Sequence, residues 1–496
     1  MLHRISFKAS GVLNKSSNLQ SLSKKIDKNR FISKTVSQKR SQHTGMWPYA
    51  IEMAVIPDGV DGVCRYEGPV GGNGPQAVQH KNGRKGYSID MLRQVQQSAS
   101  KKLKDAGVNV TTRETAHLQP VKSAIFSYAG IIPDRILKTL YERVIMSDVL
   151  DHDGRLINTF LNQEKIRHFL FDMQLPVLYN EILEKCLKGI FSGYADSIYI
   201  ANAAFLTNNA FGNKNEYQFI FVPTYPQKAM ERRTEHAHDI AYALANGTMP
   251  IILQTAFEGV ANLKPLNYLF KINGERYQLA LGYESSRSEL KSIKEINKWQ
   301  KKLGLPKYHV IKLMPQSGKE NELYHEDCAI NLCTDKIQYS NEDWSRKQIT
   351  VTKILSEFKP NGIACIVNNG LDRYSIKFIN QAIKTKVFLN PENDPLIANV
   401  VITKNKAGKH ILLISDKVTS ENESEVKALG IEVIKMPNLS FGGGGSWQCM
   451  SNAAAQKQQT ISPKDWQKFS ESHQIKLSPL LYEAVKERYS HLTRKG

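Results

Sequence analysis

Short apolar runs alternate with helical patterns through more than half of this 496-residue chain. Between about residues 190 and 455, segments of strand length such as YQFIFVPTY and HILLIS are separated by segments with apolar residues at helical spacing, such as SELKSIKEINKWQKKLG. Strands that alternate with helices are typical of α/β and α+β domains. We therefore expect an α/β domain over residues 190–455, which has room for five units of roughly 50 residues each.

The remaining residues divide into three further segments by composition. Residues 1–45 are basic and Ser-rich, with ten Lys or Arg residues and one acid, and we expect a disordered tail or a transit-like segment. Residues 46–189 hold a glycine-rich stretch and several amphipathic patterns, including Ile89 to Lys104, and form a partly helical N-terminal region of unknown role. Residues 456–496 contain Ser462-Pro463, a helix-start signal that predicts a C-terminal helical extension.

The formal net charge of +20 is concentrated in the first segment, which supplies 10 − 1 = +9 of it. A basic N-terminus with few acids resembles an organelle transit peptide, so we expect a cytoplasmic or a mitochondrial location. The chain lacks the nucleic-acid-binding motifs, and the glycine run lacks the Lys of a P-loop, so we expect no nucleic-acid partner.

Hydropathy and cysteine spacing exclude further classes of protein. No apolar run reaches the ~18–20 residues of a membrane span. The six cysteines are scattered, and none forms a C-x-x-C pair. This pattern predicts reduced thiols rather than a disulfide framework or a zinc site, and we expect no metal and no cofactor.

One cysteine stands in an unusual setting. Cys449 follows a run of four glycines and a Trp in the segment FGGGGSWQCMSN. Glycine lets a backbone approach a ligand closely, and a Cys placed there acts as a nucleophile once its thiolate is favoured. A flexible linker followed by a buried Cys is the alternative interpretation.

A second candidate is the His-x-Asp pair of the segment ELYHEDCAINL. His325 and Asp327 stand two residues apart just before an expected strand, and on an extended segment both side chains face the same way. One site then receives a general acid or base together with a carboxylate. The alternative is a surface His beside two acids.

Together these segments resemble the guanidino-group modifying, or pentein, superfamily of arginine deiminases, dimethylarginine dimethylaminohydrolases and amidinotransferases. Further segments resemble the family in the same order along the chain: Asp196-Ser197-Ile198-Tyr199, then PQKAMERRTE, then Phe257-Glu258-Gly259, and then Ser286-Arg287-Ser288. The resemblance implies a pentein α/β propeller, in which five ββαβ-type units take a pseudo-fivefold arrangement, over residues 190–455.

The resemblance also implies a chemistry. Cys449 attacks the guanidinium carbon of arginine or a substituted arginine, His325 protonates the departing amine, and Asp327 grips the guanidinium. The covalent amidino-Cys intermediate is then hydrolysed. The remaining matching positions imply substrate-binding roles for Asp196, Asn202, Arg232, Arg233, Glu258 and Arg287.

The chain departs from the family pattern at Asn202 and Asn262, where many members have an acid. An amide accepts a hydrogen bond but does not neutralise a cation, which favours a substituted arginine over free L-arginine. Three alternatives stay open: an amidinotransferase that passes the amidino group to an amine, an inactive pentein-fold binding protein, and a basic interaction protein whose tail binds anionic surfaces. The oligomeric state is not predicted.

Overall fold

The computed structural model describes fifteen stretches of the chain. These are residues 50–56, 63–64, 87–114, 200–201, 204–207, 218–224, 236–283, 291–319, 323, 325–345, 350–391, 394, 396–438, 445–454 and 460–494. Internal contacts divide the chain into Met1–Ser41 and Gln42–Gly496, and every described residue belongs to the second unit.

Five small sheets account for most of the strands that the structure describes. Their strands, in hydrogen-bonding order, are β18 (Ser451–Ala453), β1 (Ala50–Val55) and β4 (Asn109–Glu114); β5 (Phe205–Leu206), β6 (Gln218–Thr224) and β7 (Thr248–Ala256); β10 (Lys307–Leu313), β9 (Glu275–Tyr283), β8 (Leu263–Ile272) and β12 (Gln338–Trp344); β11 (Ile330–Cys333), β13 (Ile363–Val367) and β14 (Thr385–Leu389); and β15 (Val401–Lys404), β16 (His410–Ser415) and β17 (Glu432–Met436). A further pair joins β2 (Val63–Cys64) to β3 (Tyr87–Ser88).

The helices fall into crossover helices and others. The crossover helices are α2 (Ile89–Asp105), α7 (His236–Ala245), α8 (Lys291–Lys302), α11 (Arg373–Ala382) and α12 (Ser420–Ala428). The others are the 3-10 turn η5 (Gly259–Ala261), α9 (Glu326–Ala329), α10 (Val351–Ser356), α13 (Pro463–Ser472) and α14 (Pro479–Arg494).

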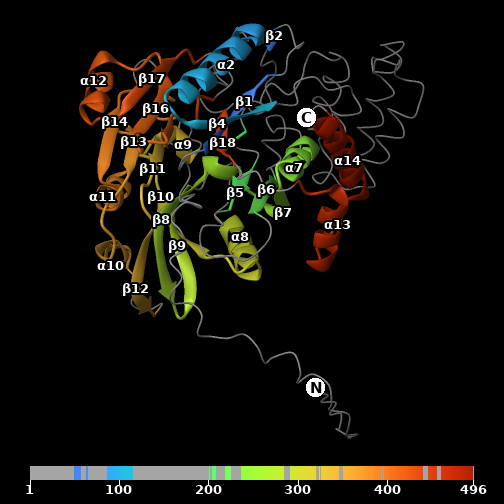
Figure 1. Cartoon of the computed structure of the whole chain (residues 1–496). Coiled ribbons are helices and arrows are strands. Elements are labelled where there is room, and N and C mark those ends of the chain that lie inside the picture. The colour runs from blue at the N-terminus through green and yellow to red at the C-terminus, as the bar shows by residue number, and fades with distance from the viewer. Residues whose placement is uncertain are drawn as a thin grey trace, which may run out of the picture. The chain divides into compact units, whose positions relative to one another are not determined.

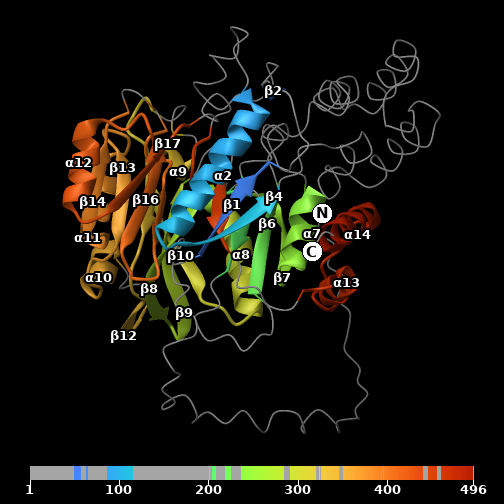
Figure 2. The same ribbon diagram turned by 45° about the horizontal axis from the view of Figure 1, so that its top comes forward.

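The five sheets repeat one topology. In each, a middle strand pairs antiparallel with one neighbour and parallel with the other, and a crossover helix joins the two parallel strands. Parallel neighbours require such a crossover, which is why strand-like and helical patterns alternate along the sequence. The expected α/β fold is therefore observed. Figures 1 and 2 show α11 and α12 beside the sheets of β13–β17 and α14 beside α7.

The sheet of β1 joins the first and the last of the described strands. Ile51 of β1 pairs with Ala453 of β18, while the other edge of β1 pairs in parallel with β4. The sequence placed β1 and β4 in a separate N-terminal region, whereas the structure places them in one sheet with a strand that follows Cys449. No local pattern indicates a pairing between residues this far apart.

Several locally encoded features match the sequence interpretation. Helix α2 covers the amphipathic stretch from Ile89, and Gly107 follows it with φ +83°, a conformation that suits glycine. Ser462 caps α13 by accepting a hydrogen bond from the backbone N–H of Asp465, with Pro463 in the first turn. The helices expected between residues 125 and 190 lie outside the described residues.

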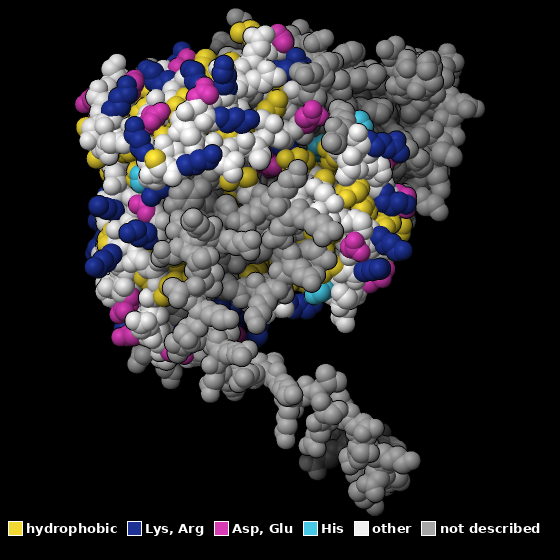
Figure 3. Space-filling view, in the orientation of Figure 1, with side chains coloured by type: hydrophobic (Ala, Val, Ile, Leu, Met, Phe, Trp, Pro, Cys, Tyr) yellow, Lys and Arg dark blue, Asp and Glu magenta, His cyan; other side chains and the backbone are white. Residues whose placement is uncertain are grey.

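The surface carries both signs of charge. Figure 3 shows Lys and Arg side chains interspersed with Asp and Glu over the described part of the face in view. Among the described residues, no helix combines the length and apolar character needed to cross a bilayer.

Candidate active site

His325 and Glu258 form a buried pair. His325 Nε2 lies 2.5 Å from Glu258 Oε2, and both side chains are almost fully buried. Glu258 stands at the start of η5, directly before β8, and His325 stands at the start of α9. A carboxylate in this position fixes the orientation of the imidazole ring, as the third member of a catalytic triad does.

Gly259 makes the close packing beside Glu258 possible. Its φ is +56°, and a Cβ atom built there would lie 2.3 Å from the carbonyl oxygen of Ala201. The backbone N–H of Val260 donates to that same oxygen, and the N–H of Ala201 donates to the carbonyl of Cys449. Residue 201 thus ties the Glu258 turn to the Cys449 turn through main-chain hydrogen bonds.

Asn399 holds Cys449 in place from the segment before β15. Its Oδ1 accepts a hydrogen bond from the backbone N–H of Cys449 at 3.1 Å, and its Nδ2 donates to the Cys449 Sγ at 3.2 Å. The same Nδ2 lies 3.3 Å from the carbonyl oxygen of Asp327. One buried amide therefore positions both the thiol and the His-x-Asp segment.

Asp327 lies between two thiols. Its Oδ2 is 3.7 Å from the Sγ of Cys449, and its Oδ1 is 3.8 Å from the Sγ of Cys328. Asp327 is fully buried and Cys449 nearly so. The sequence interpretation expected an extended segment here, and that expectation is wrong, because Asp327 belongs to the short helix α9. We call Cys449, His325, Asp327, Glu258 and Asn399 the Cys449 cluster.

The environment of Cys449 disfavours its thiolate. Burial raises the pKa of Cys449 well above its usual value, and the neighbouring Asp327 and Cys328 raise it further. The backbone of Ser446 and the side chain of Asn399 act in the opposite direction by hydrogen bonding. A cation between the thiol and Asp327 therefore favours ionisation of Cys449.

The structure brings four of the nine sequence-predicted site residues together: Cys449, His325, Asp327 and Glu258. The other five lie outside the described residues: Asp196, Asn202, Arg232, Arg233 and Arg287. Asn262 is described, and its Oδ1 accepts a hydrogen bond from the backbone N–H of Glu326.

Three fully buried polar residues in or near the cluster were not predicted from the sequence: Asn399, Lys264 and Glu326. Two of them left a signal in the sequence. Asn399 interrupts the apolar run LIANVVI, and Lys264 interrupts the otherwise apolar start of β8. A polar side chain inside a buried strand pattern requires a partner, which makes such positions candidates for site residues.

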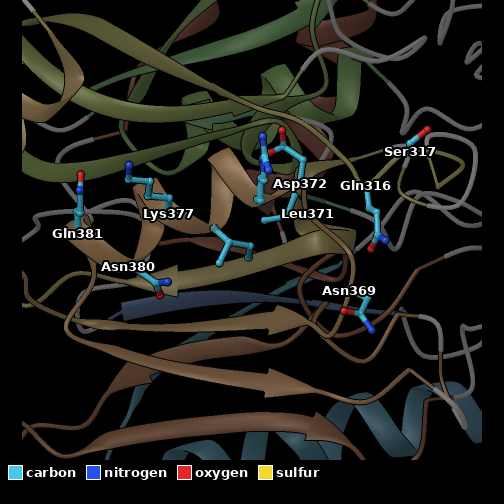
Figure 4. A pocket seen from close by; sticks show the side chains of 10 residues that line it. Gln316, Ser317, Asn369, Leu371, Asp372, Lys377, Asn380 and Gln381 are labelled. Atoms are coloured by element: carbon cyan, nitrogen blue, oxygen red, sulfur yellow. The ribbon is translucent and has the colours of Figure 1, made fainter.

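A cavity of about 770 Å³ lies apart from the Cys449 cluster and shares no residue with it. Figure 4 shows its wall, which includes Gln316, Asp372, Lys377 and Asn380. Among the described residues, no group of three or more His, Cys, Asp or Glu side chains is arranged to hold a metal ion.

Comparison with known proteins gives structural matches only. No family model and no curated protein sequence matches the chain. The chain is similar to the N-terminal domain of ArgZ, an arginine dihydrolase from the ornithine-ammonia cycle in cyanobacteria, at 16% identity and a TM-score of 0.45, covering 82% of this chain and 98% of that one. It is also similar to AgrE bound to L-arginine, at 14% identity and a TM-score of 0.42, covering 82% of this chain and 40% of that one.

A third match is SxtG, an amidinotransferase from Microseira wollei in the saxitoxin biosynthetic pathway. The identity is 11% and the TM-score 0.42, covering 84% of this chain and 98% of SxtG. ArgZ, AgrE and SxtG are all members of the pentein superfamily, the family that the sequence motifs resemble.

Proposed function

We propose that the protein is a cysteine-dependent hydrolase that acts on the guanidino group of arginine or a substituted arginine. One observation carries the proposal: the Cys449 thiol lies against the buried Asp327 carboxylate, two residues from a His325–Glu258 pair. Nucleophile, carboxylate and oriented imidazole are the three groups that cleavage of a guanidinium C–N bond requires.

Asp327 binds the guanidinium group of the substrate. The bound guanidinium in turn favours ionisation of the Cys449 thiol. A guanidinium carbon is a weak electrophile because its positive charge is delocalised, so the group must be held and oriented. The carboxylate of Asp327 accepts charge-assisted hydrogen bonds from the guanidinium N–H groups. The bound cation then lies beside Cys449 and offsets the burial and the like charge that disfavour its thiolate.

The reaction then proceeds in two steps. The thiolate of Cys449 forms a bond to the guanidinium carbon, a C–N bond breaks, and His325 donates a proton to the departing nitrogen. An amidino group remains on the sulfur. Water activated by the now neutral His325 adds to the same carbon, the C–S bond breaks, and the electron pair returns to the Cys449 thiolate.

We further propose that the five sheets form a pentein propeller around a pseudo-fivefold axis. The repeated sheet topology and the pairing of the last described strand, β18, with the first, β1, support this arrangement. In this arrangement the catalytic domain includes β1, α2 and β4 in addition to the strands after residue 200. Residues 1–45 and 456–496 remain a proposed tail and a proposed helical extension.

A product screen by mass spectrometry tests the function. Wild type and Cys449→Ala are each incubated with one guanidine at a time, with and without glycine as an acceptor amine. The guanidines are arginine, methylarginines, succinylarginine, agmatine, guanidinoacetate and arginine-containing peptides. Cys365→Ala is the matched control, because Cys365 is also fully buried but lies in β13, in a different hydrophobic cluster from Cys449.

We expect one guanidine to be converted by wild type and by Cys365→Ala but not by Cys449→Ala. If conversion requires glycine, the activity is transfer of the amidino group to an amine and not hydrolysis. Equal conversion by Cys449→Ala and wild type contradicts the role of Cys449. No conversion of any guanidine contradicts the proposal and leaves a binding role.

A further inference from the structure

Asn399 is joined to the turn that carries Cys449 at three points. Its backbone carbonyl accepts a hydrogen bond from the N–H of Gln448 at 3.3 Å, and its side-chain Oδ1 accepts one from the N–H of Cys449 at 3.1 Å. Its Nδ2 lies 3.2 Å from the Cys449 Sγ. Asn399 is fully buried, so these bonds form away from bulk water, where they are stronger.

The orientation of the Asn399 amide follows from its neighbours. A backbone N–H can only donate, so the atom that faces the N–H of Cys449 is the amide oxygen. The nitrogen then faces the Cys449 sulfur and, at 3.3 Å, the carbonyl oxygen of Asp327, which can only accept. Both N–H groups of the amide therefore have acceptors, and the sulfur is one of them.

A donor that faces the sulfur distinguishes the thiolate from the thiol. A neutral thiol is a weak acceptor, whereas a hydrogen bond to an ionised acceptor is roughly twice as strong as a neutral one. Burial, and then Asp327, raise the pKa of Cys449, and the hydrogen bond with Asn399 acts to lower it. Cys328 of α9 also disfavours the thiolate, and Lys264 of β8 favours it.

We propose that Asn399 is a catalytic residue whose side-chain amide stabilises negative charge on the Cys449 sulfur. The inference deepens the proposed function, on which it rests. The sulfur carries that charge twice, once before it attacks the guanidinium carbon and again when the C–S bond breaks and the electron pair returns to it. The amide belongs to the fold and is in place at both stages.

Asn331 of β11 offers a matched control. It is almost fully buried, and its Nδ2 donates to the same carbonyl oxygen of Asp327 at 3.3 Å and to that of Ala398 at 2.9 Å. Replacing either asparagine by leucine removes a donor from the Asp327 carbonyl and fills the space with a side chain of similar size. Asn399→Leu also removes the two side-chain bonds to Cys449.

The test measures thiol reactivity without any substrate, so it gives an answer even if the proposed function fails. Iodoacetamide alkylates thiolates, and peptide mass spectrometry reads alkylation of Cys449 separately from that of the other cysteines. The rate is measured from pH ~7 to ~10 in wild type, Asn399→Leu, Asn399→Ala and Asn331→Leu, and urea unfolding shows that each is folded. Asn399→Ala leaves space for a water that bonds the N–H of Cys449, which protects folding.

The direction of the change separates a bond to the sulfur from a tether for the turn. If Asn399 only holds the turn, its loss exposes Cys449 to water. Alkylation then becomes faster, because burial is the main cause of the raised pKa of Cys449. If Asn399 stabilises the thiolate, its loss leaves less thiolate at a given pH, and alkylation becomes slower.

We expect Asn399→Leu to slow the alkylation of Cys449 about threefold to tenfold at fixed pH, the effect of one hydrogen bond. Asn399→Ala should be slowed less, since an entering water can donate to the sulfur in place of the amide. Asn331→Leu should react at the wild-type rate.

A folded Asn399→Leu that reacts at the wild-type rate or faster overturns the proposal. Equal slowing by Asn331→Leu overturns it as well, because the effect then comes from the Asp327 carbonyl. Slower alkylation of Asn399→Leu, with no turnover of any guanidine by wild type, keeps the bond between Asn399 and the thiolate and rejects the proposed function instead.

Discussion

At the scale of single residues, Asp327 has two opposite effects on the proposed reaction. As an anion 3.7 Å from the Cys449 Sγ it disfavours the thiolate, and as a partner for a guanidinium it holds the substrate. Both effects come from one charge, so removing that charge while keeping the shape separates them.

Asp327→Asn should therefore change thiol reactivity and turnover in opposite directions. We expect alkylation of Cys449 near pH ~7.5 to become severalfold faster, because a like charge is lost. We expect kcat/KM for the guanidine to fall about 100-fold or more, because an amide does not neutralise the cation. Parallel alkylation and turnover assays check this, and a fall in both rates would point to misfolding or to a different role for Asp327.

At the scale of elements, the turn that carries Glu258 depends on Gly259. Gly259 and Gly274 both have positive φ, but a Cβ atom at Gly259 would collide with backbone oxygens of residues 201 and 204, whereas at Gly274 it meets nothing within 4 Å. Gly259→Ala therefore destabilises the folded state through backbone strain and through a steric clash, whereas Gly274→Ala destabilises it through backbone strain alone.

We expect Gly274→Ala to lower the free energy of unfolding by about 1 kcal/mol and Gly259→Ala to lower it by about 3 kcal/mol or more, with loss of turnover. Urea unfolding of the two variants checks the difference. Equal destabilisation would show that the turn relaxes and does not fix Glu258.

Helix α7 contains a histidine that makes stability depend on pH. His238 is buried, and its Nε2 donates to the carbonyl of Glu114 in β4 at 3.1 Å. Burial, with help from Arg113, lowers the pKa of His238 to about 3. The unfolded chain therefore binds a proton below pH ~6.5 that the folded chain does not, so stability is lost as the pH falls from ~6.5 toward ~3.

Between pH ~7.5 and ~5 this linkage should cost wild type about 2 kcal/mol, and His238→Gln should lack that part of the decrease. The glutamine amide can still donate to Glu114. Urea titrations at the two pH values measure the slopes, and identical slopes in wild type and variant would show that His238 binds its proton in the folded state as well.

The sequence predicted the elements whose signals are local. Helix α13 was predictable because Ser462 and Pro463 encode its start. Helix α9 was not predictable, since four residues carry too little periodicity. The site followed the same rule: Cys449 and His325 stood out in their segments. Asn399 shows in the sequence only as one polar residue in an apolar run, and its contacts with Cys449 arise from the tertiary structure.

At the scale of the whole molecule, the pairing of β1 with β18 makes the first and the last described strands depend on one another. Deleting residues 1–41 removes the separate unit alone, so we expect a cooperative unfolding transition and Cys449-dependent turnover to remain. Deleting residues 1–114 removes β1, α2 and β4 and leaves β18 without its partner strand, so we expect loss of cooperative folding.

Thermal unfolding and the product assay on both deletions check these expectations. Loss of function on deletion of residues 1–41 would favour the basic tail as the functional part of the chain. A folded, active chain that begins at residue 115 would contradict the role of the β1 sheet.

The central claim is that the Cys449 sulfur bonds to a guanidinium carbon during turnover. The most direct measurement is acid quenching during turnover of the best substrate of the screen, labelled with ¹³C at the guanidino carbon, followed by peptide mass spectrometry. We expect the label as an amidino adduct on the Cys449 peptide of wild type, and neither adduct nor product from Cys449→Ala. Label on another residue, or product formed by Cys449→Ala at the wild-type rate, would contradict the claim.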